Sequence, residues 1–192
     1  MAIEVERRGD APVLVEMKEG FGKGAKRVLA SLRLAMGFIF AWAFIDKLVG
    51  LGFSTGRQAD GTIDFFAEGA AALNGGLPAA GFLGRARGPL GGFWQGMADQ
   101  AWVSWIFMAA LAGVGLALLL GIGMRLAAVS GGLLMLCMWS AGLWPQSNPF
   151  VDSHIIYALV VVVLAVTASG HTWGFGERWG RTRLVQRFPI LK

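Results

Sequence analysis

The chain has 192 residues, of which 55% are hydrophobic and only 15% are Asp, Glu, Lys or Arg. Soluble domains carry roughly 25% charged residues, so this composition, with a mean hydropathy of +0.58, indicates that lipid is the solvent. The net charge of +5 raises the question of nucleic-acid binding. However, the basic residues flank apolar runs and form no module of mixed basic and aromatic residues, which excludes that class.

The N-terminal region, residues 1–27, is polar and of mixed charge, and it ends in a basic cluster. Acidic residues precede the first apolar run, which is not the pattern of a secretory signal peptide, so we expect a cytoplasmic arm. The apolar run 28–53 follows, interrupted only by Arg33, Asp46 and Lys47. A hydrocarbon core of about 30 Å needs about 20 helical residues, so this run predicts the first membrane span.

The segment 54–100 has a different composition, rich in glycine and with several acidic residues. Loops of this length without regular structure are uncommon and usually functional. We expect a long, partly helical loop outside the cytoplasm, with short helices at Ile63–Leu73 and Leu90–Ala98.

Three further apolar runs predict three further spans, at 101–122, 126–144 and 154–169. The first two of these are joined by the short turn Gly123–Arg125 and read as a tight helical hairpin. A basic cytoplasmic tail, 171–192, completes the chain. The predicted fold is therefore all-α, an integral membrane four-helix bundle over residues 28–170.

Orientation follows from the positions of lysine and arginine, which are enriched in cytoplasmic flanks and short loops. The N-terminal arm, the turn containing Arg125 and the tail are basic, whereas the connection between the last two spans has no basic residue. Tryptophans prefer the interface and lie near the predicted span ends. These signals place both termini in the cytoplasm.

Small residues are spaced for close helix packing, which drives association of helices in lipid. Along the second span they form a predicted contact stripe, and shorter pairs occur in the third and first spans. These residues are Ala109, Gly113, Ala117 and Gly121; Ala127 with Gly131 and Ala128 with Gly132; and Gly37 with Ala41.

Two basic residues of the first span are candidates for binding. Arg33 lies near the cytoplasmic side, where it either extends to the headgroups or acts as a buried guanidinium that binds an anion. Lys47 lies about 20 Å further along the helix and therefore near the outer interface. It follows a long apolar run and precedes the glycine-rich loop.

The start of the last span carries the candidates for proton transfer, His154 and Asp152. One interpretation is a helix cap with an interfacial histidine; the other is a quinone or oxyanion site in which one of them moves protons. Tyr157 is three residues after His154 and shares its helix face. Trp102, Trp105 and Trp139 are expected to form the apolar walls of such a site.

Several cofactors are excluded by the residue inventory. Two histidines and one cysteine cannot form an ordinary tetrahedral zinc site. His154 and His171 lie at opposite predicted membrane faces, so they cannot hold one haem together. Thiol-based quinone reduction needs a pair of cysteines, and Cys137 is alone. We expect no metal and no haem.

Four short motifs together resemble the DoxX/DoxD family of membrane proteins. The resemblance implies a four-span bundle in a prokaryotic plasma membrane. The best-known relative is the membrane subunit of thiosulfate:quinone oxidoreductase, which implies quinone as the cofactor, although family membership transfers the fold better than the reaction. The motifs are Leu32–Gly37 leading to Asp46–Leu48, Leu119–Ala128, Asn148–His154 and Ala168–Gly174.

The first functional hypothesis is a membrane subunit of a quinone-linked redox system, with Arg33, Lys47, Asp152 and His154 as its polar groups. Such a chain has no redox group of its own and needs a soluble or membrane redox partner. The second hypothesis is a non-enzymatic scaffold or small-molecule-binding protein that docks a redox or envelope complex. A transporter is disfavoured, because four spans without internal symmetry offer no alternating-access machinery. Oligomerisation is compatible with either hypothesis.

Overall fold

The computed structural model describes residues 5–8, 11–14, 21–145 and 148–191. Four helices dominate this part of the chain: α1 (Lys23–Val49), α4 (Ala101–Leu120), α5 (Met124–Ala141) and α6 (Ser153–Val166). The first three are long and apolar enough to cross a membrane. The expectation of a helical, membrane-type protein is therefore confirmed.

The remaining elements are short. Two strands pair antiparallel in the N-terminal arm, with Val5 opposite Leu14, whereas the sequence predicts no strand. The other elements lie in the long loop and in the C-terminal segment. They are β1 (Val5–Arg8), β2 (Ala11–Leu14), η1 (Ala72–Asn74), α2 (Ala80–Leu83), α3 (Gly91–Gly96), η2 (Ser169–His171), α7 (Gly176–Gly180), α8 (Arg183–Arg187) and η3 (Pro189–Leu191).

Helix α1 ends at Val49 rather than continuing to Phe53, because two features stop it. Gly50 takes a left-handed conformation with φ 78°, and its N–H donates to the carbonyl of Asp46 at 2.7 Å. The Asp46 carboxylate then accepts the backbone N–H groups of Leu51, Phe53 and Ser54. The chain is thereby turned back, and the residues that extend the apolar run belong to the loop.

The other helix ends also differ from the expected spans. Gly121, with φ 71°, ends α4, and α5 ends at Ala141 instead of reaching Trp144. Helix α6 has only 14 residues. At 1.5 Å per residue it is about 21 Å long, shorter than a hydrocarbon core of about 30 Å.

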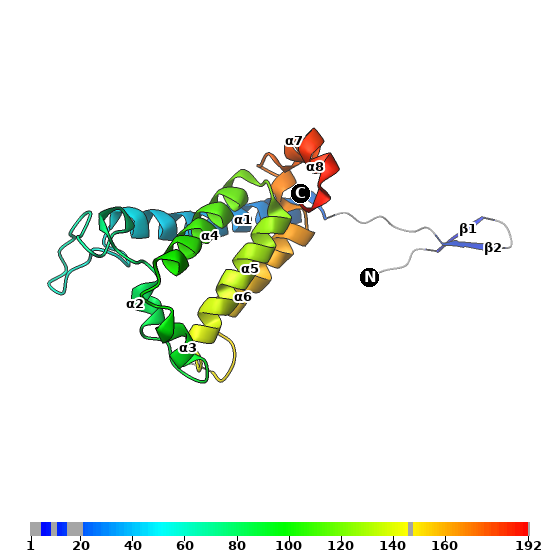
Figure 1. Ribbon diagram of the computed structural model, residues 1–192. Coiled ribbons are helices and arrows are strands. Elements are labelled where there is room, and N and C mark those ends of the chain that lie inside the picture. Colours follow the sequence, from blue (N-terminus) through cyan, green and yellow to red (C-terminus); the bar gives the residue numbers. More distant parts are fainter. Residues whose placement is uncertain (1–4, 9–10, 15–20, 146–147, 192) are drawn as a thin grey trace.

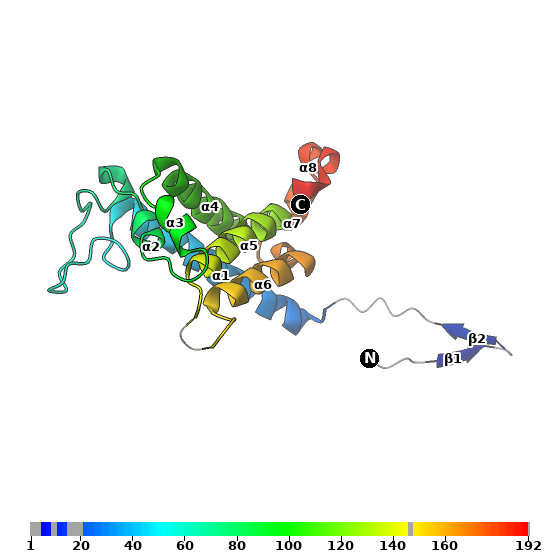
Figure 2. The same ribbon diagram turned by 60° about the horizontal axis from the view of Figure 1, so that its bottom comes forward.

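The long helices pack as two pairs, α1 with α4 and α5 with α6, and α4 also contacts α5. Figures 1 and 2 show α5 and α6 side by side. The start of α1, the α4–α5 turn and the C-terminal segment meet at one end of the helices, and the long loop lies at the other end. A core of large apolar side chains joins the pairs, formed by Met36, Phe40, Leu111, Val114, Leu118, Met135, Val161 and Leu164.

Glycines allow the close approach of α1 and α4, but not along the whole predicted stripe. A Cβ on Gly37 would lie 2.9 Å from the Leu119 nitrogen, and one on Gly115 would lie 2.7 Å from the Ala41 nitrogen. A Cβ on Gly113, by contrast, would meet no described atom within 4 Å. Residues four apart are rotated by about 40° per step, so a stripe of that period winds away from a straight contact line. The predicted stripe is therefore wrong at Gly113, which makes no close contact with another described helix.

The loop is built mainly of turns. Of the two predicted loop helices, Ile63–Leu73 is replaced by turns and the short η1, whereas Leu90–Ala98 contains α3. Helices α2 and α3 are held against the end of α5 by a small alanine-rich core. This core consists of Ala79, Leu83, Ala86, Ala98 and Ala141.

Candidate functional site

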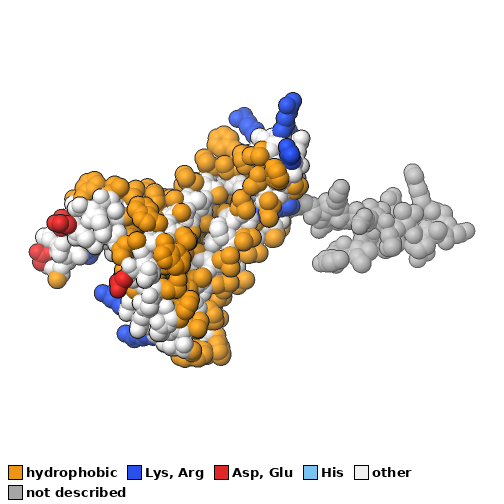
Figure 3. All heavy atoms as spheres, in the orientation of Figure 1, with side chains coloured by type: hydrophobic (Ala, Val, Ile, Leu, Met, Phe, Trp, Pro, Cys, Tyr) orange, Lys and Arg blue, Asp and Glu red, His pale blue; other side chains and the backbone are white. Residues whose placement is uncertain are grey.

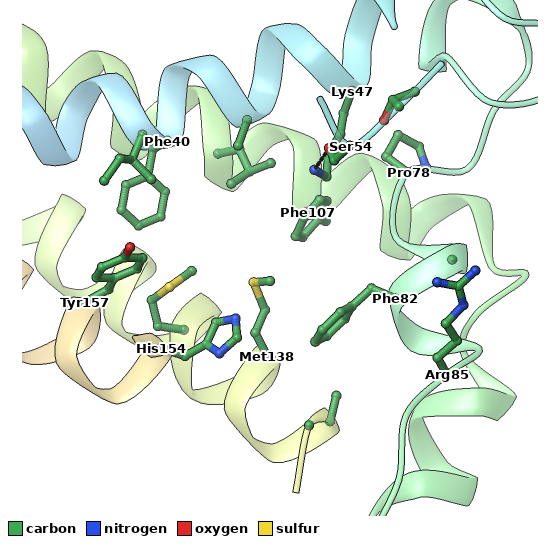
Figure 4. A pocket seen from close by; sticks show the side chains of 18 residues that line it. Phe40, Lys47, Ser54, Pro78, Phe82, Arg85, Phe107, Met138, His154 and Tyr157 are labelled. Carbon is green, nitrogen blue, oxygen red and sulfur yellow. Dashed lines mark hydrogen bonds between the residues drawn. The ribbon is translucent and has the colours of Figure 1, made fainter. Parts of the chain in front are cut away.

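A cavity of about 580 Å³ lies between the helix pairs, at the end covered by the long loop. Its walls come from α1, α4, α5, α6 and the loop (Figure 4). The deeper wall is apolar, with Phe40, Phe107, Leu111, Met135 and Met138. The polar side chains that line the cavity are those of Lys47, Ser54, Thr55, Arg85, His154 and Tyr157.

Lys47 enters the cavity from the last turn of α1. Its Nζ donates to the Ser54 hydroxyl at 2.9 Å. An ammonium has three donors, so this hydroxyl uses only one of them. Lys47 therefore retains hydrogen-bonding capacity at the cavity wall.

The neighbouring Asp46 has the opposite character. It is 1% exposed. Besides the three backbone N–H groups, its carboxylate accepts the Ser54 hydroxyl at 2.6 Å. With its oxygens occupied, Asp46 holds the helix end and the loop start in place and does not line the cavity.

His154 is fixed by Asp152, which is the N-cap of α6. One carboxylate oxygen of Asp152 accepts the N–H groups of His154 and Ile155 at 2.9 and 3.3 Å. The other lies 2.7 Å from Nδ1 of His154. This contact orients the imidazole, so Nε2 is the nitrogen left for a ligand. Partial burial raises the pKa of Asp152, but its hydrogen bonds with His154 and Ile155 outweigh this and hold the pKa below the usual value.

The predicted cap and the predicted histidine site thus coexist in one arrangement. Tyr157, one turn further along α6, also lines the cavity, as its spacing from His154 predicts. In Figure 4, Lys47 lies on the wall opposite His154, and Tyr157 lies across from Phe40. The structure therefore brings Lys47, His154 and Tyr157 around one space.

Two loop residues complete the site, and the sequence interpretation missed both. Helix α2 carries Phe82, whose ring centroid lies 6.3 Å from that of His154. Arg85, just after α2, lines the same wall. The length of the loop indicated a function, but nothing in its sequence indicated which of its side chains line the cavity.

Arg33, a predicted binding residue, lies outside this cavity, towards the opposite end of α1. It is fully buried. Its guanidinium donates to the carbonyl of Leu118, to that of Leu119 at 3.0 Å, and to those of Thr172 and Trp173 at 3.2 and 3.0 Å. Two of these carbonyls are in the last turn of α4, where a positive charge also favours the helix dipole. Arg33 thus joins α1, α4 and the C-terminal segment, instead of extending to headgroups.

The predicted tryptophan walls also lie elsewhere. Trp102 and Trp105 are 56% and 58% exposed, and Trp139 donates its indole N–H to the carbonyl of Phe150 at 2.8 Å. Trp102 lines a second, almost wholly apolar cavity of about 410 Å³ between α4 and α5. Indoles spaced by three residues on an outer helix face point away from the bundle, so phenylalanine and methionine supply the walls instead.

The charge of the main cavity is one-sided. Lys47 and Arg85 line it, and no Asp or Glu is among the described residues of its wall. Within the described part of the chain, no cluster of three or more His, Cys, Asp or Glu side chains could hold a metal ion. The arrangement can bind a molecule with a polar, acceptor-rich head and an apolar body. Comparison of the chain with protein-family models, with curated proteins and with solved structures finds no match.

Proposed function

We propose that the chain is a membrane subunit of a quinone-linked redox system, and that the cavity beneath the long loop binds the quinone ring. The observation that supports this most is the convergence of Lys47, His154 and Tyr157 on a cavity whose other walls are apolar. A quinone combines polar and apolar parts in the same way, with two carbonyl oxygens on a ring and a hydrocarbon tail. The resemblance of the sequence motifs to the DoxX/DoxD family points the same way.

The residues fit such a ligand in size and chemistry. Small-molecule sites are typically about 300–1,000 Å³, mostly apolar, with a few placed polar groups. Lys47 and the Tyr157 hydroxyl supply donors for carbonyl oxygens, and the phenylalanine rings flank the space. Quinone reduction to quinol consumes two electrons and two protons.

In this proposal Nε2 of His154 transfers protons to the bound quinone, while Asp152 holds the imidazole ring through Nδ1. The electrons come from a separate donor, either a small reductant such as thiosulfate or a partner protein.

The proposed topology has four spans, α1, α4, α5 and α6, in a prokaryotic plasma membrane with both termini in the cytoplasm. It is supported by the meeting of the N-terminus of α1, the α4–α5 turn and the C-terminal segment at one end. Basic residues are concentrated in those three segments, as the positive-inside rule requires of a cytoplasmic side.

A second candidate is a non-enzymatic protein that binds an amphipathic anion and docks a redox or envelope complex. The one-sided charge of the wall favours it, because Lys47 and Arg85 have no carboxylate among the described lining residues to neutralise them. This candidate predicts ligand binding that depends on Lys47 and Arg85 but requires no proton transfer by His154.

The test compares His154→Ala with the matched control His171→Ala, whose residue lies outside the cavity. The protein is purified in mild detergent, its bound lipids are extracted for quinone, and quinone reduction is assayed with thiosulfate and related donors. We expect bound quinone and turnover in the wild type and the control, and loss of turnover of about 100-fold or more in His154→Ala. Absence of quinone and of turnover in the wild type, with an organic anion co-purifying instead, would reject the redox role in favour of the second candidate.

A further inference from the structure

The C-terminal segment forms a folded cap on the end of the helices opposite the long loop. The Phe175 N–H donates to the Leu120 carbonyl at 2.8 Å, and Arg125 donates to the carbonyl of Pro189 at 3.0 Å. Within the cap, the indole N–H of Trp179 donates to the carbonyl of Leu191 at 2.6 Å, and Val185 is fully buried. Helices α7 and α8 are therefore fixed relative to the α4–α5 turn.

The outer surface of this cap mixes positive and apolar side chains. The arginines of α7 and α8 are exposed, and Figure 3 shows basic side chains gathered at this tip of the molecule. Between them, Leu184, Phe188 and Ile190 are 53%, 49% and 61% exposed. A surface of arginines with interleaved apolar side chains suits a membrane interface with anionic headgroups.

Charge at this end is almost entirely of one sign. In the described segments 21–27, 120–128 and 167–191, the single acidic residue is Glu177, and it is already paired with Arg181. The loop end carries both signs, with Asp60, Asp64 and Glu68 close to Arg57 in the sequence. The basic side chains of the cap end are Lys23, Lys26, Arg27, Arg125, Arg178, Arg181, Arg183 and Arg187.

A hollow of about 310 Å³ lies in this basic surface, between the α4–α5 turn, η2 and α7. Arg125 and Arg181 line it from two different elements, together with His171 and Glu177. Two guanidinium groups that line one hollow can both bind the oxygens of a single phosphate group. The hollow is thus suited in size and charge to a phosphate-containing headgroup.

The lipid-facing surface beside the hollow distinguishes a phospholipid from a free anion. Residues next to its lining expose apolar side chains, Leu126 on α5 at 43% and Val166 on α6 at 76%. An acyl chain can run along these side chains while its phosphate stays at the end of the helices. Inorganic phosphate would use only the arginines.

We propose that the hollow between the α4–α5 turn and α7 is a binding site for an anionic phospholipid, with Arg125 and Arg181 contacting its phosphate. This site is separate from the cavity at His154 and does not depend on the function proposed for that cavity. Its occupancy would attach the C-terminal cap to the bilayer surface.

The experiment uses the full chain, delipidated in mild detergent and then titrated with phosphatidylglycerol, phosphatidylcholine or inorganic phosphate while bound species are counted by native mass spectrometry. We expect phosphatidylglycerol to bind at least ten-fold more tightly than phosphatidylcholine. Each arginine near an anionic surface contributes about five-fold, so Arg181→Gln should weaken phosphatidylglycerol binding by about that factor.

Arg87→Gln at the loop end is the matched control and should leave lipid binding unchanged. Arg125→Gln tests the second arginine. Arg181→Gln stays informative if Arg125→Gln disturbs the cap, because within the described part of the chain the Arg181 side chain is hydrogen-bonded only to Glu177. Equal binding of the two lipids, an equal loss in Arg87→Gln, or complete displacement by millimolar inorganic phosphate would overturn the proposal.

Discussion

Both ends of α1 carry charged side chains inside an apolar sequence, and the structure uses these charges in two different ways. Arg33 is enclosed and donates to four carbonyls, and Asp46 at the other end is enclosed by N–H and O–H donors. Lys47, adjacent to Asp46, contacts a single hydroxyl and lines a cavity. Enclosure by several fixed hydrogen-bond partners, rather than position in the helix, distinguishes the structural charges Arg33 and Asp46 from Lys47, which remains available to a ligand.

The largest expected effect comes from removing the buried charge of Arg33. Arg33→Met keeps an apolar side chain of similar length but leaves the carbonyls that Arg33 contacts without their donor. Buried unsatisfied groups cost about 1–3 kcal/mol each, so we expect the free energy of unfolding to fall by about 3 kcal/mol or more. Denaturant unfolding in detergent micelles measures this change.

The control for Arg33 is Arg87→Met, because Arg87 is exposed. The free energy of unfolding of Arg87→Met should lie within about 0.5 kcal/mol of that of the wild type. Equal stability of the two variants would show that Arg33 is not a structural charge.

The neighbours Asp46 and Lys47 give the sharper comparison, because their substitutions should separate stability from binding. Asp46→Ala removes the acceptor that turns the loop back, and we expect a loss of about 2 kcal/mol with faster proteolysis between residues 50 and 60. Lys47→Met should leave stability nearly unchanged but weaken binding of a ligand in the cavity by about ten-fold. Unfolding curves, limited proteolysis and ligand titration on both variants provide the measurements.

If Lys47→Met unfolded as readily as Asp46→Ala and bound ligand normally, the distinction between the enclosed Asp46 and the available Lys47 would fail. Lys23→Met, at the start of α1 and far from the cavity, controls for the loss of one positive charge.

The smallest effect concerns Asp152 and its dependence on pH. Its pKa in the folded protein is held below the usual value, so its carboxylate stabilises the fold above the unfolded pKa of about 3.9. This contribution is lost as the pH falls through the lower, folded pKa. Asp152→Asn should therefore be less stable than the wild type at pH 6–7, with the difference shrinking below about pH 4.

Thermal unfolding of both proteins between pH 3 and pH 7 gives this comparison. Asp99→Asn, at an exposed loop position, serves as the control and should show no such trend. A difference between Asp152→Asn and wild type that is constant over the whole range would contradict the assignment.

Apolar runs sufficed to predict where the long helices lie, because a span is a local property of about 20 residues. The helix ends were less predictable: Asp46 stops α1 with its side chain, although the run itself stays apolar through Phe53. Of the candidate site, His154, Tyr157 and Lys47 could be identified from spacing and position. The structural role of Arg33 could not be predicted, because the carbonyl groups that it contacts lie 85 and 139 residues away in the sequence. Phe82 and Arg85 depend on how the loop folds back, for which no local signal exists.

The shortness of α6 has a consequence for the surrounding lipid. A helix of about 21 Å placed beside longer ones cannot match a hydrocarbon layer of about 30 Å, so in the proposed four-span topology the bilayer thins locally around it. Thinning draws the polar headgroup region toward the start of α6, where His154 lines the cavity. Hydrophobic mismatch then favours the partition of this protein into thinner bilayers.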